Sequence, residues 1–208
     1  MKTIERILAV YEIEENLFEK GISVLAGIDE VGRGSWAGPV GVGVVMATSV
    51  DICRFPEGIR DSKLLSPLAR EKLLPKIEQF CLGFGIGFAD NTECDELGMT
   101  KAQALAAERA VKSAGIVPDM ILLDGKFNFT EFKNVINIVK GDSRSLLIAS
   151  ASVIAKVTRD ALMTAYDKEF PQYGFCSNKG YPSLRHRQVV ERIGLSPIHR
   201  KSWKVLSI

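Results

Sequence analysis

The sequence has few of the residues that bind transition metals or form disulfides. It contains four cysteines and two histidines, and Cys53, Cys81, Cys94 and Cys176 form no C-x-x-C pair. No spacing typical of a zinc site is therefore present. Isolated cysteines in a chain of this size predict reduced thiols that are mostly buried.

Long apolar segments are also missing. The first 20 residues carry five glutamates and no apolar stretch of the kind found in a secretory signal. Elsewhere the apolar runs are far shorter than the roughly 20 residues that a membrane helix needs. The sequence therefore predicts a soluble, cytoplasmic protein that does not bind a membrane.

The composition is that of an ordinary globular domain. The chain has 208 residues, of which 46% are hydrophobic and 25% are charged. Its 27 basic and 25 acidic residues leave a net charge of +2, which by itself indicates no partner. We expect one domain over residues 1–208, with a core over about 1–175 and a basic helical extension over about 176–208.

Hydrophobic periodicity predicts an α/β fold. We expect strands at residues 24–28, 40–46, 81–89, 120–123 and 135–139, and a surface loop at 51–64. Helices are expected at residues 3–20, 66–80, 100–113, 144–168 and 183–193. This order favours a mixed β-sheet with helices on both faces.

Three of the expected strands lead into acidic residues, namely Asp29 with Glu30, Asp124, and Asp142. Active sites of open α/β sheets gather where strands end. Converging carboxylates repel one another unless a cation lies among them, and their oxygens suit Mg²⁺ or Mn²⁺ better than zinc. Such a set predicts metal-dependent phosphodiester chemistry.

Two questions about these acids remain open from the pattern alone. Strand-end acids are often turn formers or helix caps, and nothing in the pattern shows that the three strand ends are neighbours. In addition, Asp29 and Glu30 would point to opposite faces of a regular strand. We expect either that the strand ends at Asp29 and the chain bends near Gly32, or that a bulge reorients Glu30.

The glycine-rich segment that follows carries a recognisable motif. Gly27 to Gly34, followed by Ala37-Gly38-Pro39-Val40, resembles the signature of ribonuclease HII, the type 2 ribonuclease H. Further segments similar to this family occur in the same order along nearly the whole chain: Asp61-Ser62-Lys63, Leu123-Asp124-Gly125, Lys140 to Ser143, Ala151 to Asp160, Phe170 to Phe175 and Lys179 to Pro182.

The resemblance implies a ribonuclease H-like fold with a central mixed sheet. It implies endonucleolytic cleavage of the RNA strand in RNA–DNA hybrids and of single ribonucleotides embedded in DNA, leaving 5′-phosphate and 3′-hydroxyl ends. The family's catalytic metal ligands correspond to Asp29, Glu30, Asp124 and Asp142, which would hold two Mg²⁺ or Mn²⁺ ions. In our hypothesis Asp29 shares both ions, Asp142 holds the water-activating ion, and Glu30 and Asp124 hold the other.

The resemblance also implies residues that read the substrate. Gly32-Arg33-Gly34 would approach the 2′-hydroxyl, the group that distinguishes RNA from DNA, although the segment alone could be only a tight turn. Tyr181 would stack on a sugar at the ribonucleotide junction, and a buried tyrosine is the alternative.

Other polar residues of the motifs are expected to bind the nucleic acid backbone. Lys63, Lys156 and Arg33 would contact phosphates, and Ser62 would contact phosphate or cap a turn. Arg159 and Asp160 are expected to form a structural pair. His186 and His199 have no metal spacing, and His186 is expected to be structural or peripheral.

The chain departs from the family pattern at several positions that are not acidic ligands: Ser35-Trp36, Arg60, Leu64, Lys126 and Asn178. Three alternatives also stay open: a resolvase-like nuclease of the same fold, a hybrid-binding module without activity, and a phosphotransferase. The last is disfavoured because no GxxxxGK[ST] or GxGxxG loop occurs.

The charges are unevenly distributed along the chain. Residues 1–30 hold seven acidic and three basic residues, whereas residues 179–204 hold seven basic residues and one acidic residue, Glu191. A nuclease needs acids for metal and a basic surface for phosphates, whose binding is sensitive to salt. The expected partner is an RNA–DNA hybrid or a DNA duplex containing ribonucleotides, bound by a monomer; no sliding-clamp motif is evident.

Overall fold

The computed structural model describes residues 12–203. Residues 12–19 are helical, so the second half of the helix expected at 3–20 is confirmed, and its first half lies outside the described residues. The remaining expected helices and strands are all found, with ends that shift by a few residues.

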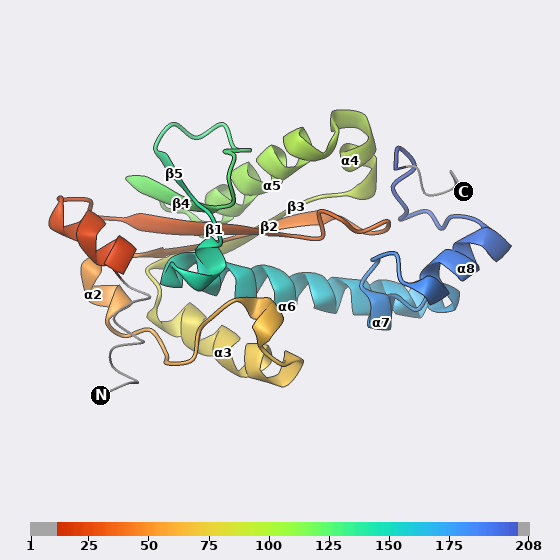
Figure 1. The fold of residues 1–208 in the computed structure, drawn as a ribbon, viewed down its shortest axis with the longest axis horizontal. Coiled ribbons are helices and arrows are strands. Elements are labelled where there is room, and N and C mark those ends of the chain that lie inside the picture. The colour runs from red at the N-terminus through yellow and green to blue at the C-terminus, as the bar shows by residue number, and fades with distance from the viewer. Residues whose placement is uncertain (1–11, 204–208) are drawn as a thin grey trace.

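The centre of the molecule is a five-stranded mixed sheet (Figure 1). Its strands lie in the order β3-β2-β1-β4-β5. Strand β1 pairs antiparallel with β2 and parallel with β4, β2 pairs antiparallel with β3, and β4 pairs parallel with β5. The bounds are β1 Leu25–Val31, β2 Val40–Ala47, β3 Gly83–Ala89, β4 Met120–Asp124 and β5 Val135–Ile138.

Helices cover both faces of this sheet. Figure 1 shows α5 with α4 above the strands and the long α6 with α3 below them, with α7 and α8 at the end of α6. The bounds are α2 Ser49–Ile52, α3 Pro67–Phe80, α4 Asn91–Leu97, α5 Met99–Ala114, α6 Leu146–Glu169, α7 Phe175–Asn178 and α8 Leu184–Ile193. Three 3₁₀ helices join them, η1 Ser62–Leu64, η2 Gly141–Ser143 and η3 Pro171–Tyr173. The expected α/β class is confirmed.

Two apolar layers hold the sheet between the helices. Alternate residues of β1 enter opposite layers, since Leu25 packs with α6 residues whereas Ala26 and Ile28 pack with α5 residues. Every residue of β2 is buried because helices lie on both of its faces. A third apolar cluster joins the end of α6 to α7 and α8 and includes Met163 and Phe175.

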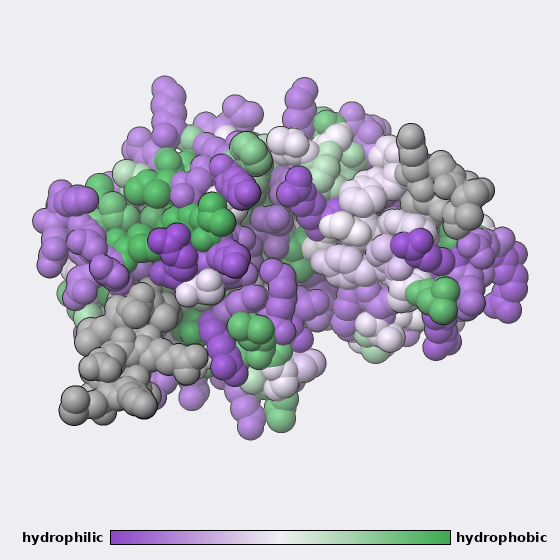
Figure 2. All heavy atoms as spheres, viewed as in Figure 1, coloured by the Kyte–Doolittle hydropathy of each residue, from purple (hydrophilic) through white to green (hydrophobic). Residues whose placement is uncertain are grey.

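Figure 2 shows one face of the molecule, on which a hydrophobic area lies at the left among polar residues. Hydrophilic residues dominate the face drawn in Figure 2, including the end that holds α8. Within residues 12–203, none of the helices has the length and apolar character required to cross a lipid bilayer.

Candidate active site

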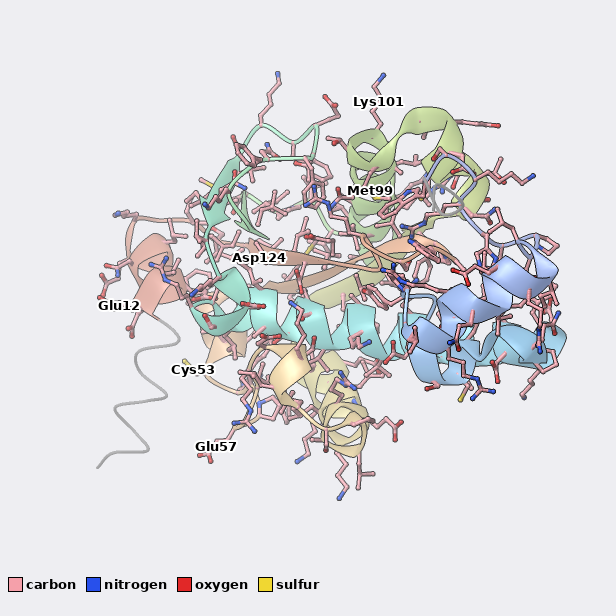
Figure 3. All side chains as sticks on the ribbon, turned by 45° about the vertical axis from the view of Figure 1, so that its right-hand side comes forward. Glu12, Cys53, Glu57, Met99, Lys101 and Asp124 are labelled. Atoms are coloured by element: carbon pink, nitrogen blue, oxygen red, sulfur yellow. The ribbon has the colours of Figure 1, made fainter. Side chains whose placement is uncertain are left out.

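The strand order brings the acidic residues to one edge of the sheet. Asp29 and Glu30 lie near the end of β1, Asp124 is the last residue of β4, and Asp142 lies in η2, just after β5. The backbone N–H of Gly141 donates to Asp124 Oδ1 at 2.6 Å, which joins the β4 end to η2. Figure 3 labels Asp124 beside the sheet. Because β1, β4 and β5 are consecutive in the sheet, residues far apart in sequence meet here.

The expected bend or bulge at Asp29 and Glu30 is wrong. Strand β1 continues to Val31, and its register with β2 stays regular, with Asp29 opposite Gly43 and Glu30 opposite Val42. The antiparallel partner strand extends as far as β1 and keeps it straight. The two side chains therefore point to opposite faces of the sheet, with Asp29 on the side of α6 and Glu30 on the side of α5.

Burial and mutual repulsion raise the pKa values of Asp29, Glu30 and Asp142. Burial, with a further contribution from the Glu30 carboxylate, raises the pKa of Asp29 to about 8. The pKa of Glu30 is raised by burial and then by Asp124. The pKa of Asp142 is also raised, by burial and by the carboxylates of Asp61 and Asp124. Charged carboxylates are thus costly at this edge without a compensating cation.

Among the described residues, Lys63 is the only cation that forms an ion pair with one of the four acids. Its Nζ lies 3.5 Å from Asp142 Oδ2 and 4.0 Å from Asp61 Oδ1. Burial opposes the charge of Lys63, but Asp29, Asp61 and Asp142 raise its pKa overall. Its side chain is 73% exposed, so it offsets the acidic charge only weakly.

The chemistry of the acidic group fits hard divalent cations. All four side chains offer carboxylate oxygens, which Mg²⁺ and Mn²⁺ prefer, and burial followed by the Glu30 carboxylate makes the charged form of Asp29 costly without a cation. Within residues 12–203, no three Asp, Glu, His or Cys side chains converge as a preformed metal site. Like charges repel, and Asp29 and Glu30 start from opposite faces, so these carboxylates would have to draw together around a cation.

A cleft of about 420 Å³ opens beside these acids and is lined by all the expected substrate contacts. Its lining joins β1, the glycine-rich loop, η1, α6 and the loop before α8. The lining residues are Asp29, Glu30, Val31, Gly32, Arg33, Gly34, Ser62, Lys63, Ser152, Lys156 and Tyr181. We call it the main cleft. All seven expected substrate-binding residues therefore lie in one cleft, together with two of the four acids.

Gly32 and Tyr181 meet inside the main cleft. The backbone N–H of Gly32 donates to the Tyr181 hydroxyl at 3.2 Å. Gly32 has φ +78, and a Cβ there would overlap the Arg159 side chain. Arg33 and Gly34 are exposed, and Tyr181 is 37% exposed, so the buried-tyrosine alternative is wrong. Glycine is needed at position 32 by both the conformation and the close approach of Arg159.

Ser62 lies behind the cleft surface and is only 3% exposed. Its hydroxyl is 2.7 Å from the hydroxyl of Ser152 on α6, which in turn hydrogen-bonds to the Asp29 carboxyl. Arg70 on α3 donates to the Ser62 carbonyl at 3.1 Å. Ser62 therefore supports Asp29 through Ser152 more directly than it faces a phosphate. The sequence argument missed Ser152, although a hydroxyl on the sheet-facing side of α6 was a usable signal.

The expected pair of Arg159 and Asp160 is wrong. Asp160 instead accepts from Lys156 at 2.8 Å, one helical turn earlier. Arg159 is fully buried and donates to the carbonyls of Pro39, Ala37 and Lys179. Residues i and i+1 point in different directions on a helix, whereas i and i+4 are neighbours. Lys156 therefore borders the main cleft, and the Asp160 carboxylate balances part of its positive charge.

A second, smaller cleft lies on the other face of β1. It has a volume of about 270 Å³ and contains Glu30 and Asp124, and Arg33 also lines it. Thr100 and Gln103 of α5 form one side, and the loop after β4 forms another, including Lys126 and the 82% exposed Phe127. Glu30 and Arg33 line both clefts, so these two residues lie on the ridge between them.

Only some of the basic side chains in the C-terminal region are exposed. Arg185, Arg187 and Arg192 on α8 are exposed, as is Lys201. Arg200 is fully buried, so it is unavailable to a phosphate backbone. The charge count along the sequence could not separate this buried arginine from its exposed neighbours.

Comparison with known proteins identifies the family. The family model for ribonuclease HII matches residues 26–206. A ribonuclease HII of Clostridioides difficile is 40% identical over 202 residues, covering 97% of this chain and 78% of that protein. One of Thermus thermophilus is 42% identical over 191 residues, covering 92% and 91%.

A solved structure has the same architecture. Ribonuclease H2 of Pyrococcus horikoshii aligns with a TM-score of 0.75 at 28% identity, covering 88% of this chain and 95% of that one. The resolvase-like nuclease and the module without activity, left open by the sequence, do not agree with these matches. The chain belongs to the ribonuclease HII family and is a ribonuclease H enzyme.

Proposed function

We propose that this enzyme cleaves the RNA strand of RNA–DNA hybrids, and cleaves on the 5′ side of single ribonucleotides in duplex DNA, leaving 5′-phosphate and 3′-hydroxyl ends. The observation that carries the proposal is the main cleft. It places Asp29 and Glu30 beside an exposed glycine loop and an exposed tyrosine. Residues 1–208 would act as one catalytic domain and as a monomer.

The acidic residues would form the reaction centre. Asp29, Glu30, Asp124 and Asp142 would hold two Mg²⁺ or Mn²⁺ ions, which when bound lower the pKa of water and stabilise the leaving oxygen of a phosphodiester. The Ser152 hydroxyl orients the Asp29 carboxyl from the α6 side. Lys63, within 3.5 Å of Asp142, would approach a backbone phosphate next to the reaction centre.

The glycine loop and Tyr181 would recognise the ribonucleotide. The backbone of Gly32-Arg33-Gly34 borders the cleft, and backbone groups can hydrogen-bond a 2′-hydroxyl, which deoxyribose lacks. The Tyr181 ring comes within 4.0 Å of the Cβ position at Gly34, so a sugar bound at the loop would lie against the ring. Lys156 and Arg33 would contact the flanking phosphates.

Cleavage assays with Asp29→Asn test the proposal. The purified enzyme is given a duplex with one ribonucleotide, an all-RNA hybrid and an all-DNA duplex, with Mg²⁺, Mn²⁺ or chelator. We expect the wild type to cut the first two only when an ion is present. Asp29→Asn should lower the rate by a factor on the order of 10³ while hybrid binding changes little.

Glu57→Gln is the matched control, since it also exchanges a carboxylate for an amide, at an exposed position outside both clefts. It should keep the wild-type rate. Near wild-type cutting by Asp29→Asn, or equal cutting of the all-DNA duplex, would contradict the proposal.

A further inference from the structure

The segment of residues 196–202 lies against the glycine-rich loop, although the two are far apart in sequence. The Arg200 N–H donates to the Trp36 carbonyl at 2.8 Å, and the Gly38 N–H donates to the Ile198 carbonyl at 2.9 Å. Ala37 and His199 form an isolated antiparallel bridge. This C-terminal segment thus acts as a short partner strand for the chain just after the loop.

The Arg200 guanidinium fixes the backbone of the loop itself. It is fully buried and donates to the carbonyls of Gly32 at 2.8 Å, Arg33 at 2.9 Å and Gly38 at 3.1 Å. Within the described residues it has no salt bridge to a carboxylate, and burial lowers its pKa to about 10. A buried charge is costly unless it is hydrogen-bonded, and here backbone carbonyls supply the partners.

These hydrogen bonds determine where the loop N–H groups point. In a trans peptide unit the carbonyl and the N–H of the next residue lie on opposite sides of the chain. Because the Gly32 and Arg33 carbonyls face Arg200, the N–H groups of Arg33 and Gly34 face away from it. The exposed side of these two residues borders the main cleft.

A chain of hydrogen bonds leads from the same segment to Tyr181. The Ser196 backbone N–H donates to His199 Nδ1 at 2.9 Å, so the His199 proton lies on Nε2. That group can donate to His186 Nε2 at 3.0 Å, which leaves His186 with its proton on Nδ1. His186 Nδ1 then donates to the Tyr181 carbonyl at 2.8 Å.

Both histidines are fully buried, and each tautomer follows from the one before it. Burial lowers the pKa of His186, and burial followed by the neighbouring His186 lowers the pKa of His199 to about 4. The pair is therefore neutral at neutral pH and keeps this direction of hydrogen bonding. The Tyr181 hydroxyl accepts from Gly32, so the two connections from the segment meet at Gly32.

The segment is itself held in place by α4. Asn91 donates to the carbonyls of Pro197 at 3.0 Å and His199 at 3.3 Å. Asp95, one helical turn later, accepts from the N–H groups of Lys201 at 2.8 Å and Ser202 at 2.9 Å. These bonds flank Arg200 on both sides, so the guanidinium approaches the loop from a fixed backbone.

We propose that Arg200 and the His186–His199 pair are positioning residues for ribonucleotide recognition. Arg200 aims the N–H groups of Arg33 and Gly34 into the cleft, and the histidine pair sets the position of Tyr181. The proposal rests on the proposed function for what is recognised, but the positioning itself can be measured without cleavage.

Hydrogen exchange at the loop is the first test, on the full-length enzyme with Arg200→Lys, Arg200→Met and His186→Leu. We expect amide exchange at Gly32 and Ser35, whose N–H groups donate to the Tyr181 hydroxyl and the Gly32 carbonyl, to rise by roughly 10-fold in Arg200→Met, because the loop carbonyls lose their partner. Arg200→Lys keeps the charge but loses the planar fork and should also fail to protect the loop. Tyr173→Phe is the control, since it removes a buried 2.9 Å bond to Gly194 in the same region without touching the loop.

Cleavage kinetics separate positioning from general destabilisation. On a duplex with one ribonucleotide, His186→Leu should lower kcat by roughly 10-fold with little change in KM. His186→Asn, whose amide N–H can still reach the Tyr181 carbonyl, should restore most of this loss. In a Tyr181→Ala background, His186→Leu should have almost no further effect, because both changes act through one residue.

Unchanged exchange at Gly32 and Ser35 in Arg200→Met, or an effect equal to that of Tyr173→Phe, would overturn the role of Arg200. Fully multiplicative losses for His186→Leu and Tyr181→Ala would overturn the role of the histidine pair. If the wild type cuts no ribonucleotide-containing substrate, the proposed function fails, and the exchange data still decide whether Arg200 orders the loop.

Discussion

Asp29 is a buried carboxyl group whose ionisation opposes folding. It is 4% exposed, and its pKa is raised to about 8, far above the ordinary value for aspartate. The folded protein therefore holds the Asp29 proton more tightly than the unfolded chain does. As the pH rises from about 4 towards 8, the unfolded chain loses the Asp29 proton while the folded protein keeps it. The free energy of unfolding therefore falls over this range.

Replacing Asp29 by asparagine should therefore stabilise the fold. In chelator, we expect Asp29→Asn to raise Tm by a few degrees at about pH 8, and by much less at about pH 5. Thermal unfolding at both pH values measures this difference. Glu57→Gln should shift Tm little at either pH, and an equal gain for Asp29→Asn at both would show that its charge is not the cause.

The contact between β1 and α6 depends on how closely the two elements approach. A Cβ on Gly27 would overlap the backbone of Leu147 in the first turn of α6. This close packing sets α6 against the strand that carries Asp29, and it places Ser152, further along α6, within hydrogen-bond reach of that carboxyl. The sequence motif contained the glycine, but the neighbouring helix gives the reason for it.

Gly27→Ala should cost about 3 kcal/mol of unfolding free energy, because the sheet and α6 must separate. Gly58→Ala is the matched comparison: Gly58 has φ +88 but nothing within 4 Å, so its cost should be about 1 kcal/mol of backbone strain. Urea unfolding measures both values. Equal costs would mean that the contact with α6 is not tight.

At the scale of the described residues, the four acids of the candidate site and the exposed arginines of α8 lie in different places. The acids gather at the sheet edge, whereas exposed arginines gather on α8, where Arg185 and Arg192 line a shallow cleft of about 290 Å³. Figure 2 shows hydrophilic side chains over this end of the molecule. A duplex lying across the main cleft and α8 would contact the proposed metal ions at the main cleft and basic side chains on α8.

This arrangement predicts salt-dependent binding in which α8 takes part. If Arg185 and Arg192 each contact one phosphate, each change to alanine should reduce the slope of log K against log salt by about 0.9. Fluorescence anisotropy with a ribonucleotide-containing duplex in chelator measures the slope without cleavage. Lys112→Ala, at the exposed end of α5, should leave it unchanged, and unchanged slopes for the α8 variants would rule out their phosphate contacts.

The sequence by itself determined the α/β class, the strands, the longer helices and the family, because hydrophobic periodicity and local motifs depend on nearby residues. It missed short helices, including α2 and η1, which overlap the expected surface loop at 51–64. It also identified the seven cleft residues as substrate contacts and the four acids as metal ligands; these roles stay predictions. Periodicity placed the acids near strand ends without showing which strands are neighbours.

Only the tertiary structure decided how those residues meet. Pairing with β2 kept β1 straight through Glu30, which ruled out the expected bend. Lys156 forms an ion pair with Asp160, one helical turn away, and Arg159 donates to backbone carbonyls instead. Arg200, counted in the sequence as one of several basic residues, proved to be buried under the glycine loop. Burial and long-range hydrogen bonds depend on residues distant in the chain, so no local pattern encodes them.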